Sequence, residues 1–556
     1  MRPIQSIVSV FLILFSQTAW SISAAVSMPE PHAAEAAKKI LLDGGNAVDA
    51  AIASAFVLAV SYPEAGNIGG GGFMLSFVDG EPAFLDFRER APQASHRDMY
   101  LDDTGEVIPG ASLLGGKASG VPGTVKGMIE AHKRYGTVSW EKLLQPAIAL
   151  ASNGFVVPAV LADYAQGKIE EIDGKSNFEK YFGHMQAGKT FTQPQLAKTL
   201  VLIAQDPEQF YTGAIATQIV AQMKTSAGLI TLKDLAEYQA KWRAPLRARW
   251  RGTTILTAPP PSSGGFALIQ LLSMRDYASE HFENVAHNSP SYIHLLAEIE
   301  KRVFADRAAY LGDPDYVDVP MRQLLAPDYL ARRASSIEPE SISKASAVSA
   351  GLESVDTTHF SILDHHGNAV SLTYTLNWEF GSGVVVDGAG FVLNNEMDDF
   401  SVKPGVKNKF GVVGNTHNAI APGKRMLSSM TPTILLKEGK PTLILGTPGG
   451  STIFTSVFQV ILNLYDYQMP LQQAVNVTRF HHQLPDATLL RHDQRPIDTQ
   501  TKQALEKMGY TVQANSWGDL GDIAAIQVND KRVLAASDNR GRGVALLIPR
   551  RERTVD

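Results

Sequence analysis

Two strand-like runs joined by a short polar turn constrain this chain more than any other feature. Residues 357–364 (TTHFSILD) and 369–376 (AVSLTYTL) are rich in Thr, Val, Ile, Phe and Tyr, and the four residues HHGN separate them. Such a pattern is typical of a β-hairpin. Its hydroxyl-bearing side chains can form the polar face of an antiparallel pair, or they can take part in catalysis.

The residue that opens the hairpin, Thr357, becomes a nucleophile if the peptide bond after Asp356 is cut. Its new α-amine, with a reference pKa of about 7.7–8.0, could take the proton from its own hydroxyl. A threonine at the start of a strand is otherwise a common strand former. The downstream sequence has to decide between these two interpretations.

The register of the hairpin predicts the neighbours of Thr357. If Asp364 pairs with Ala369, then Thr375 and Asn377 flank the position opposite Thr357. An error of one residue in this register would still leave both of them nearby. A hydroxyl and a carboxamide would then lie beside the nucleophile, which suits a site that orients an amide substrate.

Further motifs, in this order, resemble those of the γ-glutamyltransferases. They are 66–73 (GNIGGGGF), 86–89 (DFRE), 119–124 (SGVPGT), 259–265 (PPPSSGG), 310–314 (YLGDP), 393–400 (LNNEMDDF), 427–430 (LSSM) and 446–451 (GTPGGS). The resemblance covers nearly the whole chain after its first residues. It implies the fold of that family, an α/β (α+β) four-layer αββα sandwich of the N-terminal nucleophile hydrolases.

A γ-glutamyl group ends in a zwitterion, so its pocket needs a cation for the α-carboxylate. Arg88 can bind a carboxylate through its planar fork, helped by the hydroxyls of Ser428 and Ser429. The alternative for Arg88 is an ordinary surface ion pair. The resemblance implies the carboxylate-binding role for all three residues.

The same group needs acceptors for its α-ammonium. Glu396 and Asp399 are three residues apart, and together with Asn377 they could accept hydrogen bonds from it. Solvated surface charges are the alternative for this acidic pair. The resemblance again implies the binding role.

The pair Gly449 and Gly450 follows a proline, and its small residues would let backbone N–H groups approach a substrate closely. Two such donors form an oxyanion hole, which stabilises the charge that builds on an attacked carbonyl. A plain tight turn is the alternative. The resemblance implies the oxyanion role for both glycines, beside the catalytic Thr357 and Thr375.

Cofactors, metals and nucleic acids are not expected. Residues 69–72 (GGGG) lack the spacing of a phosphate-binding loop. The pairs His365-His366 and His481-His482 are adjacent and lack metal-ligand spacing. A net charge of −6 and a pI near 6.2, with no basic stripe, give no reason to expect nucleic acid.

The N-terminus predicts export. Arg2 precedes an apolar run, and Ser23-Ala24-Ala25 offers small residues to a signal peptidase, so residues 1–25 are predicted as a signal peptide and the periplasm as the compartment. The chain has no cysteine, so disulfides and thiol catalysis are excluded. The apolar run 50–60 is too short to span a membrane, which needs ~20 residues, and we expect no such span in the mature chain.

Hydrophobic spacing predicts several elements. The expected helices are 33–42, 50–60, 143–150, 196–203 and 291–310, and the expected strands include 253–257, 433–436 and 442–445.

The chain is expected to divide at Thr357 after folding. The Ser- and Ala-rich residues 335–354 are typical of an exposed, mobile linker. Cleavage would give a large subunit (26–356) and a small subunit (357–556). Because Arg88 and Glu396 would come from different subunits to one pocket, the heterodimer should form a single domain.

The sequence thus predicts a γ-glutamyltransferase and glutathione hydrolase. It would transfer the γ-glutamyl group of glutathione-like donors to amino acids, peptides or water through an ester on Thr357. The rival hypotheses are a glutaryl (cephalosporin) acylase of the same fold and a non-catalytic exported amino-acid-binding protein.

Many bacterial members of the family have Gln instead of Glu396 and Tyr instead of Phe410, which lies in a predicted lid (404–414), and smaller residues instead of Trp378.

Overall fold

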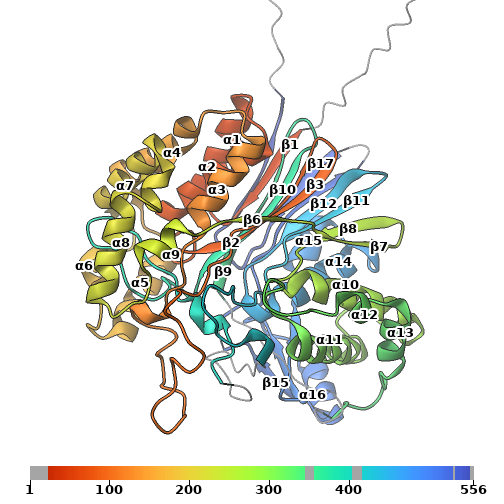
Figure 1. Cartoon of the computed structure of the whole chain (residues 1–556). Coiled ribbons are helices and arrows are strands. Elements are labelled where there is room, and N and C mark those ends of the chain that lie inside the picture. The colour runs from red at the N-terminus through yellow and green to blue at the C-terminus, as the bar shows by residue number, and fades with distance from the viewer. Residues whose placement is uncertain (1–22, 345–355, 404–415, 517, 530–531, 551–556) are drawn as a thin grey trace, which may run out of the picture.

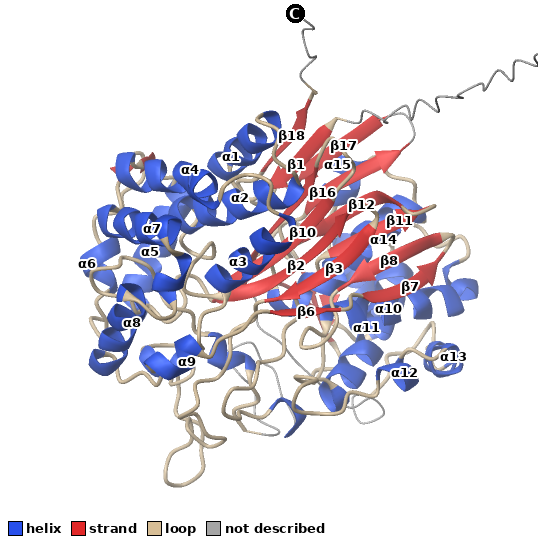
Figure 2. Ribbon diagram, turned by 45° about the horizontal axis from the view of Figure 1, so that its top comes forward, coloured by secondary structure: helices blue, strands red, loops and turns tan. Residues whose placement is uncertain are grey.

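Two stacked antiparallel sheets lie between two groups of helices. The computed structural model describes residues 23–344, 356–403, 416–516, 518–529 and 532–550. One sheet has the strand order β18-β1-β9-β10-β2-β3-β6 and the other β17-β16-β12-β11-β8-β7. Helices cover the outer face of each sheet (Figures 1 and 2). This arrangement confirms the four-layer αββα sandwich.

Strands from distant parts of the chain alternate in both sheets. The seven-stranded sheet contains β1 (Ala24–Met28), β2 (Gly71–Val78), β3 (Glu81–Asp86), β6 (Lys241–Arg243), β9 (Asp356–Leu363), β10 (Ala369–Asn377) and β18 (Val544–Ile548). The six-stranded sheet contains β7 (Leu246–Trp250), β8 (Thr253–Thr257), β11 (Thr433–Lys437), β12 (Lys440–Gly446), β16 (Ala524–Asn529) and β17 (Arg532–Ser537). Two small sheets comprise β4 (Phe155–Val156) with β5 (Thr190–Phe191), and β13 (Phe480–His482), β14 (Leu489–His492) and β15 (Thr511–Ala514).

The helices form the two outer layers. On the side of the seven-stranded sheet lie α1 (Pro31–Leu42), α2 (Ala47–Ser61), α3 (Thr124–Tyr135), α4 (Trp140–Asn153), α5 (Ala159–Ile172), α6 (Phe178–Phe182), α7 (Pro194–Gln205), α8 (Ala214–Thr225) and α9 (Leu232–Ala236). On the other side lie α10 (Gly264–Tyr277), α11 (Pro290–Tyr310), α12 (Met321–Leu324), α13 (Pro327–Ser335), α14 (Ile453–Tyr465), α15 (Leu471–Asn476) and α16 (Thr499–Met508). Each helix and strand predicted from spacing lies within one of these elements.

The apolar run 50–60 lies in α2, which is buried along its whole length. A helix that is hydrophobic all round belongs in a core. A capping box fixes its start: the Asn46 side chain accepts from the backbone N–H of Asp49, and the Asp49 side chain accepts from that of Asn46. Neighbouring α1 and α4 pack against α2.

The predicted hairpin is β9 and β10, and it lies in the middle of the seven-stranded sheet. Strand β9 pairs with β1, while β10 pairs with β2. The segments before and after Thr357 are therefore interleaved within one sheet. Separating them would expose strand edges in the centre of this sheet.

The two faces of the hairpin differ in chemistry. Phe360, Ile362 and Leu372 face the core beneath the helices. Toward the other sheet, Leu363 and the strand-β2 residues Phe73 and Leu75 are apolar. Closer to the start of β9, the same intersheet face carries Thr357, His359 and Ser361, alternating along the strand as its two-residue period requires.

Most of the described part of the predicted linker is exposed, but Ile337 is buried and Ser343 is bound by α11. Lys301 on α11 donates to the Ser343 carbonyl at 2.9 Å, and the Ser343 backbone N–H donates to Glu298 at 3.1 Å. Buried side chains of α11 thus bind the backbone at Ser343, and the mobility expected of the linker stays a prediction. Residues 345–355 lie outside the described part of the chain, as does the predicted lid (404–414) with Phe410.

Candidate active site

One pocket at the beginning of β9 brings together nearly all the predicted site residues. Thr357 and Thr375 come from the hairpin, Arg88 follows β3, and the acidic pair lies on the short 3-10 helix η5 (Glu396–Asp399). The lining residues are Arg88, Thr357, Thr375, Asn377, Glu396, Asp399, Ser428, Ser429, Met430, Gly450 and Ile453. Gly449 immediately precedes Gly450 but does not itself line the pocket.

The register of the hairpin differs from the prediction by one residue. Leu363, rather than Asp364, pairs with Ala369. Asp364 instead belongs to the turn, where its Oδ1 accepts from the backbone N–H groups of His366 and Asn368 at 2.8 and 3.0 Å. Such side-chain to backbone bonds are typical of Asp in turns.

A β-bulge restores the predicted neighbours of Thr357. Thr358 pairs with Tyr374, but Asp356 pairs with Asn377, so β10 has one extra residue opposite Thr357. Asn377 has a φ of 82° and its backbone N–H donates to the Thr375 hydroxyl at 2.7 Å. Bulges of this kind reorient side chains next to active sites, and here Thr375 and Asn377 both reach the pocket.

Arg88 binds the two carboxylates that sequence analysis assigned to the opposite end of a ligand. Its guanidinium donates to Glu396 and to Asp399, and a third carboxylate, Glu89, lies 3.7 Å away. Arg88, Glu89 and Glu396 are at most 1% exposed. The alternatives of a surface ion pair and of solvated charges are therefore excluded for these residues.

The carboxylates outnumber the cation that binds them. Burial raises the pKa of Glu396 well above its ordinary value, and the charges of Glu89 and Asp399 add to this against the lowering effect of Arg88. Burial likewise raises the pKa of Glu89 to about 7. Burial lowers the pKa of Arg88, but the three carboxylates outweigh burial and the net shift is upward. The cluster therefore holds a proton more readily than isolated carboxylates would.

Glu89 is a site residue that sequence analysis missed. It belongs to the motif DFRE that supplied Arg88, and this adjacency to a predicted ligand-binding cation was the available signal. Gly71 makes room for it, since a Cβ there would lie 2.6 Å from Glu89 Oε2. The glycine run 66–73 thus has a packing role beside the pocket.

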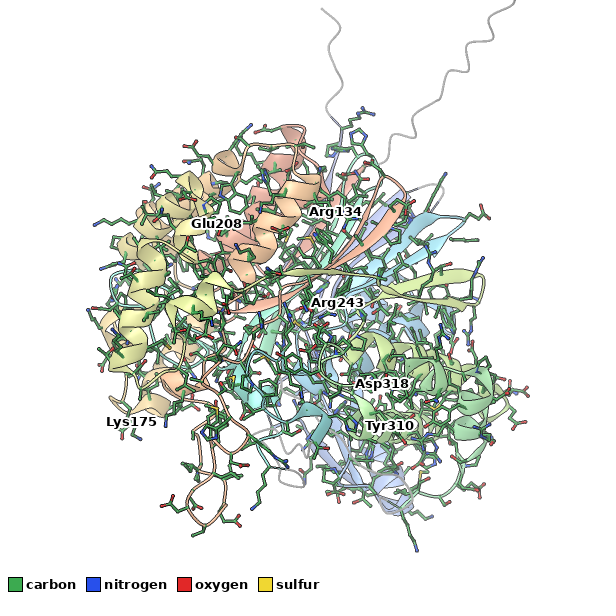
Figure 3. All side chains as sticks on the ribbon, in the orientation of Figure 1. Arg134, Lys175, Glu208, Arg243, Tyr310 and Asp318 are labelled. Atoms are coloured by element: carbon green, nitrogen blue, oxygen red, sulfur yellow. The ribbon has the colours of Figure 1, made fainter. Side chains whose placement is uncertain are left out.

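A chain of hydrogen bonds and ion pairs stabilises the loop that carries Arg88. Its backbone N–H donates to Asp86 Oδ1 at 3.0 Å, and Arg243 Nε donates to Asp86 Oδ2 at 2.7 Å. Arg243 also binds Asp315 at 2.7 Å. Figure 3 shows Arg243, the last residue of β6, near the centre of the molecule. These partners fix the loop that presents Arg88.

The motif PPPSSGG positions the two serines of the pocket. Ser428 donates its backbone N–H to the Pro261 carbonyl at 2.9 Å, and the Ser263 N–H donates to the Ser428 carbonyl at 2.6 Å. The Ser429 hydroxyl is buried and has no hydrogen-bond partner among the described residues. A buried, unpaired hydroxyl that lines a pocket is a donor suited to a ligand.

Both glycines of the predicted oxyanion turn have backbone conformations that favour glycine. The φ angles are 128° for Gly449 and 53° for Gly450. The Gly449 carbonyl accepts from the backbone N–H and the hydroxyl of Thr452 at 3.0 and 2.8 Å. A Cβ on Gly449 would lie 2.6 Å from the Thr452 hydroxyl, so a larger residue would disturb the turn.

Histidines are not placed to act on Thr357. No histidine lines this pocket in the described part of the chain. His365 and His366 lie in the turn at the opposite end of the hairpin, between the two strands as predicted. Burial lowers the pKa of His481 to about 3 and that of His482 to about 4, so both are neutral.

His359, two residues from Thr357, is a structural residue of the intersheet face. Ser361 donates its only proton to the Ala524 carbonyl, so it accepts from His359 Nε2, and Nδ1 then accepts from the Thr373 hydroxyl at 2.8 Å. Burial lowers the pKa of His359 to about 3. The ring is neutral and both its nitrogens are bound, so it is no general base.

The described residues contain no group of three or more His, Asp or Glu side chains arranged to hold a metal ion. Within the same ranges, no helix is both long and apolar enough to cross a membrane.

The four-layer fold with a threonine at the start of a central strand defines the class of N-terminal nucleophile hydrolases. A cephalosporin acylase from Bacillus halodurans matches the structure with a TM-score of 0.83 and 26% identity, over 98% of each chain. A gamma-glutamyltranspeptidase from Pseudomonas nitroreducens, complexed with L-DON, matches with a TM-score of 0.57 and 54% identity, covering 58% of this chain and 96% of that one.

Sequence comparison identifies the family within this class. The family model described as gamma-glutamyltranspeptidase matches residues 33–548. A glutathione hydrolase proenzyme of Pseudomonas aeruginosa is 57% identical over 94% of this chain and 94% of its own length. The chain belongs to the gamma-glutamyltranspeptidase family, as the resemblance of its motifs implied.

Proposed function

We propose that this protein is a self-processing γ-glutamyltransferase and glutathione hydrolase. The observation that carries the proposal is the single pocket in which Thr357 lies with a buried arginine and a buried acidic pair. These charges match the carboxylate and ammonium of a γ-glutamyl donor. The glutathione hydrolase proenzyme related to this chain supports the same substrate class.

The uncut chain is the precursor. Thr357 lies inside β9, where its nitrogen is a peptide amide, and cleavage after Asp356 would convert that nitrogen to an α-amine. The products would be a large subunit (26–356) and a small subunit (357–556), held together by the interleaved strands. The chain of the P. nitroreducens gamma-glutamyltranspeptidase matches 58% of this chain, a share that a separate large subunit would have.

Export to the periplasm is part of the proposal. Residues 1–25 would be the signal peptide, of which residues 1–22 lie outside the described part of the chain. Ala24 and Ala25 are the first residues of β1 and pair with β18. The cleavage position therefore bears directly on how much of β1 remains.

Donor binding would exchange internal ion pairs for pairs with the ligand. The α-carboxylate would bind Arg88 with the hydroxyls of Ser428 and Ser429. The α-ammonium would bind Glu396 and Asp399, with the carboxamide of Asn377. Because Arg88 already pairs with both acids, a ligand carrying both charges replaces each bond that it breaks, whereas a ligand with one charge leaves a buried partner unpaired.

The chemistry would proceed in two acyl transfers. The Thr357 hydroxyl oxygen attacks the γ-carbonyl carbon while the α-amine takes its proton, and the backbone N–H groups of Gly449 and Gly450 stabilise the oxyanion. The C–N bond breaks, the leaving amine receives the proton, and a γ-glutamyl ester on Thr357 remains. Water or the amine of an amino acid or peptide then attacks the ester carbonyl carbon and gives a proton to the α-amine. The bond from the acyl carbon to the Thr357 oxygen breaks, that oxygen receives the proton, and the γ-glutamyl product leaves. Thr375 would support the nucleophile from the adjacent strand.

A glutaryl acylase is the second candidate, favoured by the similarity in fold to the cephalosporin acylase. A glutaryl group lacks the α-ammonium, so it would leave Glu396 and Asp399 without a cationic partner on the ligand. The two buried carboxylates therefore favour a γ-glutamyl donor. Activity on γ-glutamyl and glutaryl anilides, measured side by side, distinguishes the two candidates.

Replacement of the nucleophile tests the mechanism. Thr357→Ala should leave the protein as one chain without activity, whereas Thr357→Ser should retain some cleavage and turnover because it keeps the hydroxyl. The matched control is Thr358→Ala, since the Thr358 hydroxyl is buried without a partner among the described residues. Intact mass and N-terminal sequencing report cleavage. A cleaved and active Thr357→Ala protein would refute the proposal.

A further inference from the structure

The helix η5, which carries the two proposed ammonium ligands, also carries a third buried carboxylate. Asp398 lies between Met397 and Asp399, and it is 2% exposed. Arg88 binds Glu396 and Asp399. Three carboxylates within four buried residues repel one another, so the direction in which each of them points depends on its hydrogen bonds.

Ser112 supplies a hydrogen bond to this third carboxylate. Its hydroxyl donates to Asp398 Oδ1 at 2.5 Å, and Ser112 is 7% exposed. Ser112 belongs to the long connection between β3 and α3, drawn as an orange loop that extends away from the sheets (Figure 1). The proposed subunit boundary thus separates the two partners, with the serine in the large subunit and the aspartate in the small one.

The residues around Ser112 hold the same region of the small subunit. The Leu113 carbonyl accepts from Asn395 Nδ2 at 2.9 Å, and the Gly120 N–H donates to Asn394 Oδ1 at 2.9 Å. Tyr100, from the same connection, shares an apolar cluster with Met397 and Phe400. The connection therefore contacts both the residues before η5 and η5 itself.

We propose that Ser112 is a positioning residue that sets the discrimination between γ-glutamyl and glutaryl donors. This inference rests on the proposed function. The Ser112 hydroxyl holds the carboxylate of Asp398 to the side of η5 that faces the large subunit. That bond fixes the rotation of η5 and so the position of Asp399, the next residue, against the α-ammonium of the donor.

The physical reason is the cost of losing a hydrogen bond to a buried charge. Without the hydroxyl, Asp398 turns toward other donors and η5 rotates with it. A displacement of about 1 Å in a residue that orients a substrate is enough to lower the rate of an enzyme severalfold or more. The glutaryl group has no α-amine to bind Asp399, so the rate of its reaction does not depend on the position of Asp399.

The test is steady-state kinetics of Ser112→Ala on γ-glutamyl-p-nitroanilide and on glutaryl-p-nitroanilide. We expect the KM for the γ-glutamyl substrate to rise about tenfold with kcat within about twofold, while kcat/KM for the glutaryl substrate changes less than about twofold. Ser112→Thr keeps the hydroxyl and should restore the discrimination. An equal loss on both substrates, or an unchanged ratio, would overturn the proposal.

Two controls keep the result interpretable. Thr104→Ala removes another hydroxyl-to-aspartate hydrogen bond of the same connection, the exposed 2.7 Å bond to Asp102. It should leave KM and kcat for both substrates unchanged. If Ser112→Ala folds poorly, Asp398→Asn provides a second route. In that background Ser112→Ala should have little further effect, because the buried charge is gone, and a full effect would overturn the proposal.

The proposed function and this inference fail in different ways. A wild-type protein without turnover of the γ-glutamyl anilide refutes the function. Normal wild-type turnover combined with an unchanged substrate ratio in Ser112→Ala refutes only the positioning role.

Discussion

Two buried ion clusters in this protein have opposite electrostatic character. On α11, Glu298 binds Lys301 and Arg302, so two cations surround one carboxylate. In the pocket, Arg88 is surrounded by Glu89, Glu396 and Asp399. Both clusters are almost completely buried, and they differ in which sign of charge is in excess.

The balance of charges and hydrogen bonds decides the pKa values. Burial raises the pKa of Glu298, but hydrogen bonds from Lys301, Ser343 and Arg302 outweigh burial and lower it to about 2. Burial raises the pKa of Glu89 to about 7 against the lowering effect of Arg88, and the charge of Asp399 adds to the rise. The first cluster is satisfied within the protein and anchors the chain before the proposed cleavage site. The second has capacity for a cationic ligand group.

Removing the central carboxylate of the α11 cluster should have the largest effect on stability. Glu298→Ala leaves Lys301 and Arg302 as buried cations without their carboxylate, which typically costs about 3–5 kcal/mol. Urea unfolding of the uncut Thr357→Ala precursor, which stays a single chain, measures this loss. A decrease below about 1 kcal/mol would show that the cluster behaves like a surface pair.

Removing the central cation of the pocket cluster should lower the activity. Arg88→Gln leaves the donor carboxylate poorly paired, a loss of about 2–5 kcal/mol, or roughly 30- to 5,000-fold in kcat/KM. Arg88→Lys keeps the charge but not the fork and should recover only part of it. Kinetics on a γ-glutamyl anilide provide the measurement. Near-normal kcat/KM in Arg88→Gln would contradict the assigned role.

The two clusters should also respond to pH in opposite directions. The lowered pKa of Glu298 contributes stability that is present above about pH 4.5 and is lost as the pH falls to about 2, by roughly 3 kcal/mol for a shift of that size. The raised pKa of Glu89 means that stability present below pH 4.5 is lost as the pH rises to about 7.

Glutamine substitutions separate these two windows. In the precursor, Glu298→Gln should remove the acid-side slope of the unfolding free energy, and Glu89→Gln should remove part of the slope between about pH 4.5 and 7. Unfolding measured across this pH range checks both. The comparison between the two clusters fails if both substitutions alter the unfolding free energy over the same pH range.

The smallest effect is expected for an exposed ion pair. Lys502 and Glu506 on α16 are 3.9 Å apart with side chains 44% and 46% exposed. Lys502→Ala should therefore change the unfolding free energy by at most about 0.5 kcal/mol. This variant is the exposed reference for the two buried clusters. A loss of unfolding free energy comparable to that of Glu298→Ala would show that burial does not explain the larger effect expected for a buried cluster.

Local patterns in the sequence were sufficient for the elements and for the candidate residues. The apolar run of α2 and the alternation in β9 follow from neighbours within a few positions, whereas the roles of Arg88, Glu396 and Asp399 were implied by the resemblance of their motifs to those of the γ-glutamyltransferases. The register of the hairpin was wrong by one residue because Asp364 forms the turn. Residue types alone do not reveal which of two adjacent positions will satisfy backbone groups.

The sequence by itself determined the chemistry on offer: a threonine that cleavage can turn into a nucleophile, a cation and acids for a zwitterion, and glycines for an oxyanion turn. The tertiary structure decided that β9 and β10 insert between β1 and β2, that a bulge returns Thr375 and Asn377 to Thr357, and that Glu89 lies beside Arg88. It also decided the protonation of the acids. Spacing along the chain encodes local conformation, whereas charge balance depends on burial and on distances between residues that only the folded chain brings together.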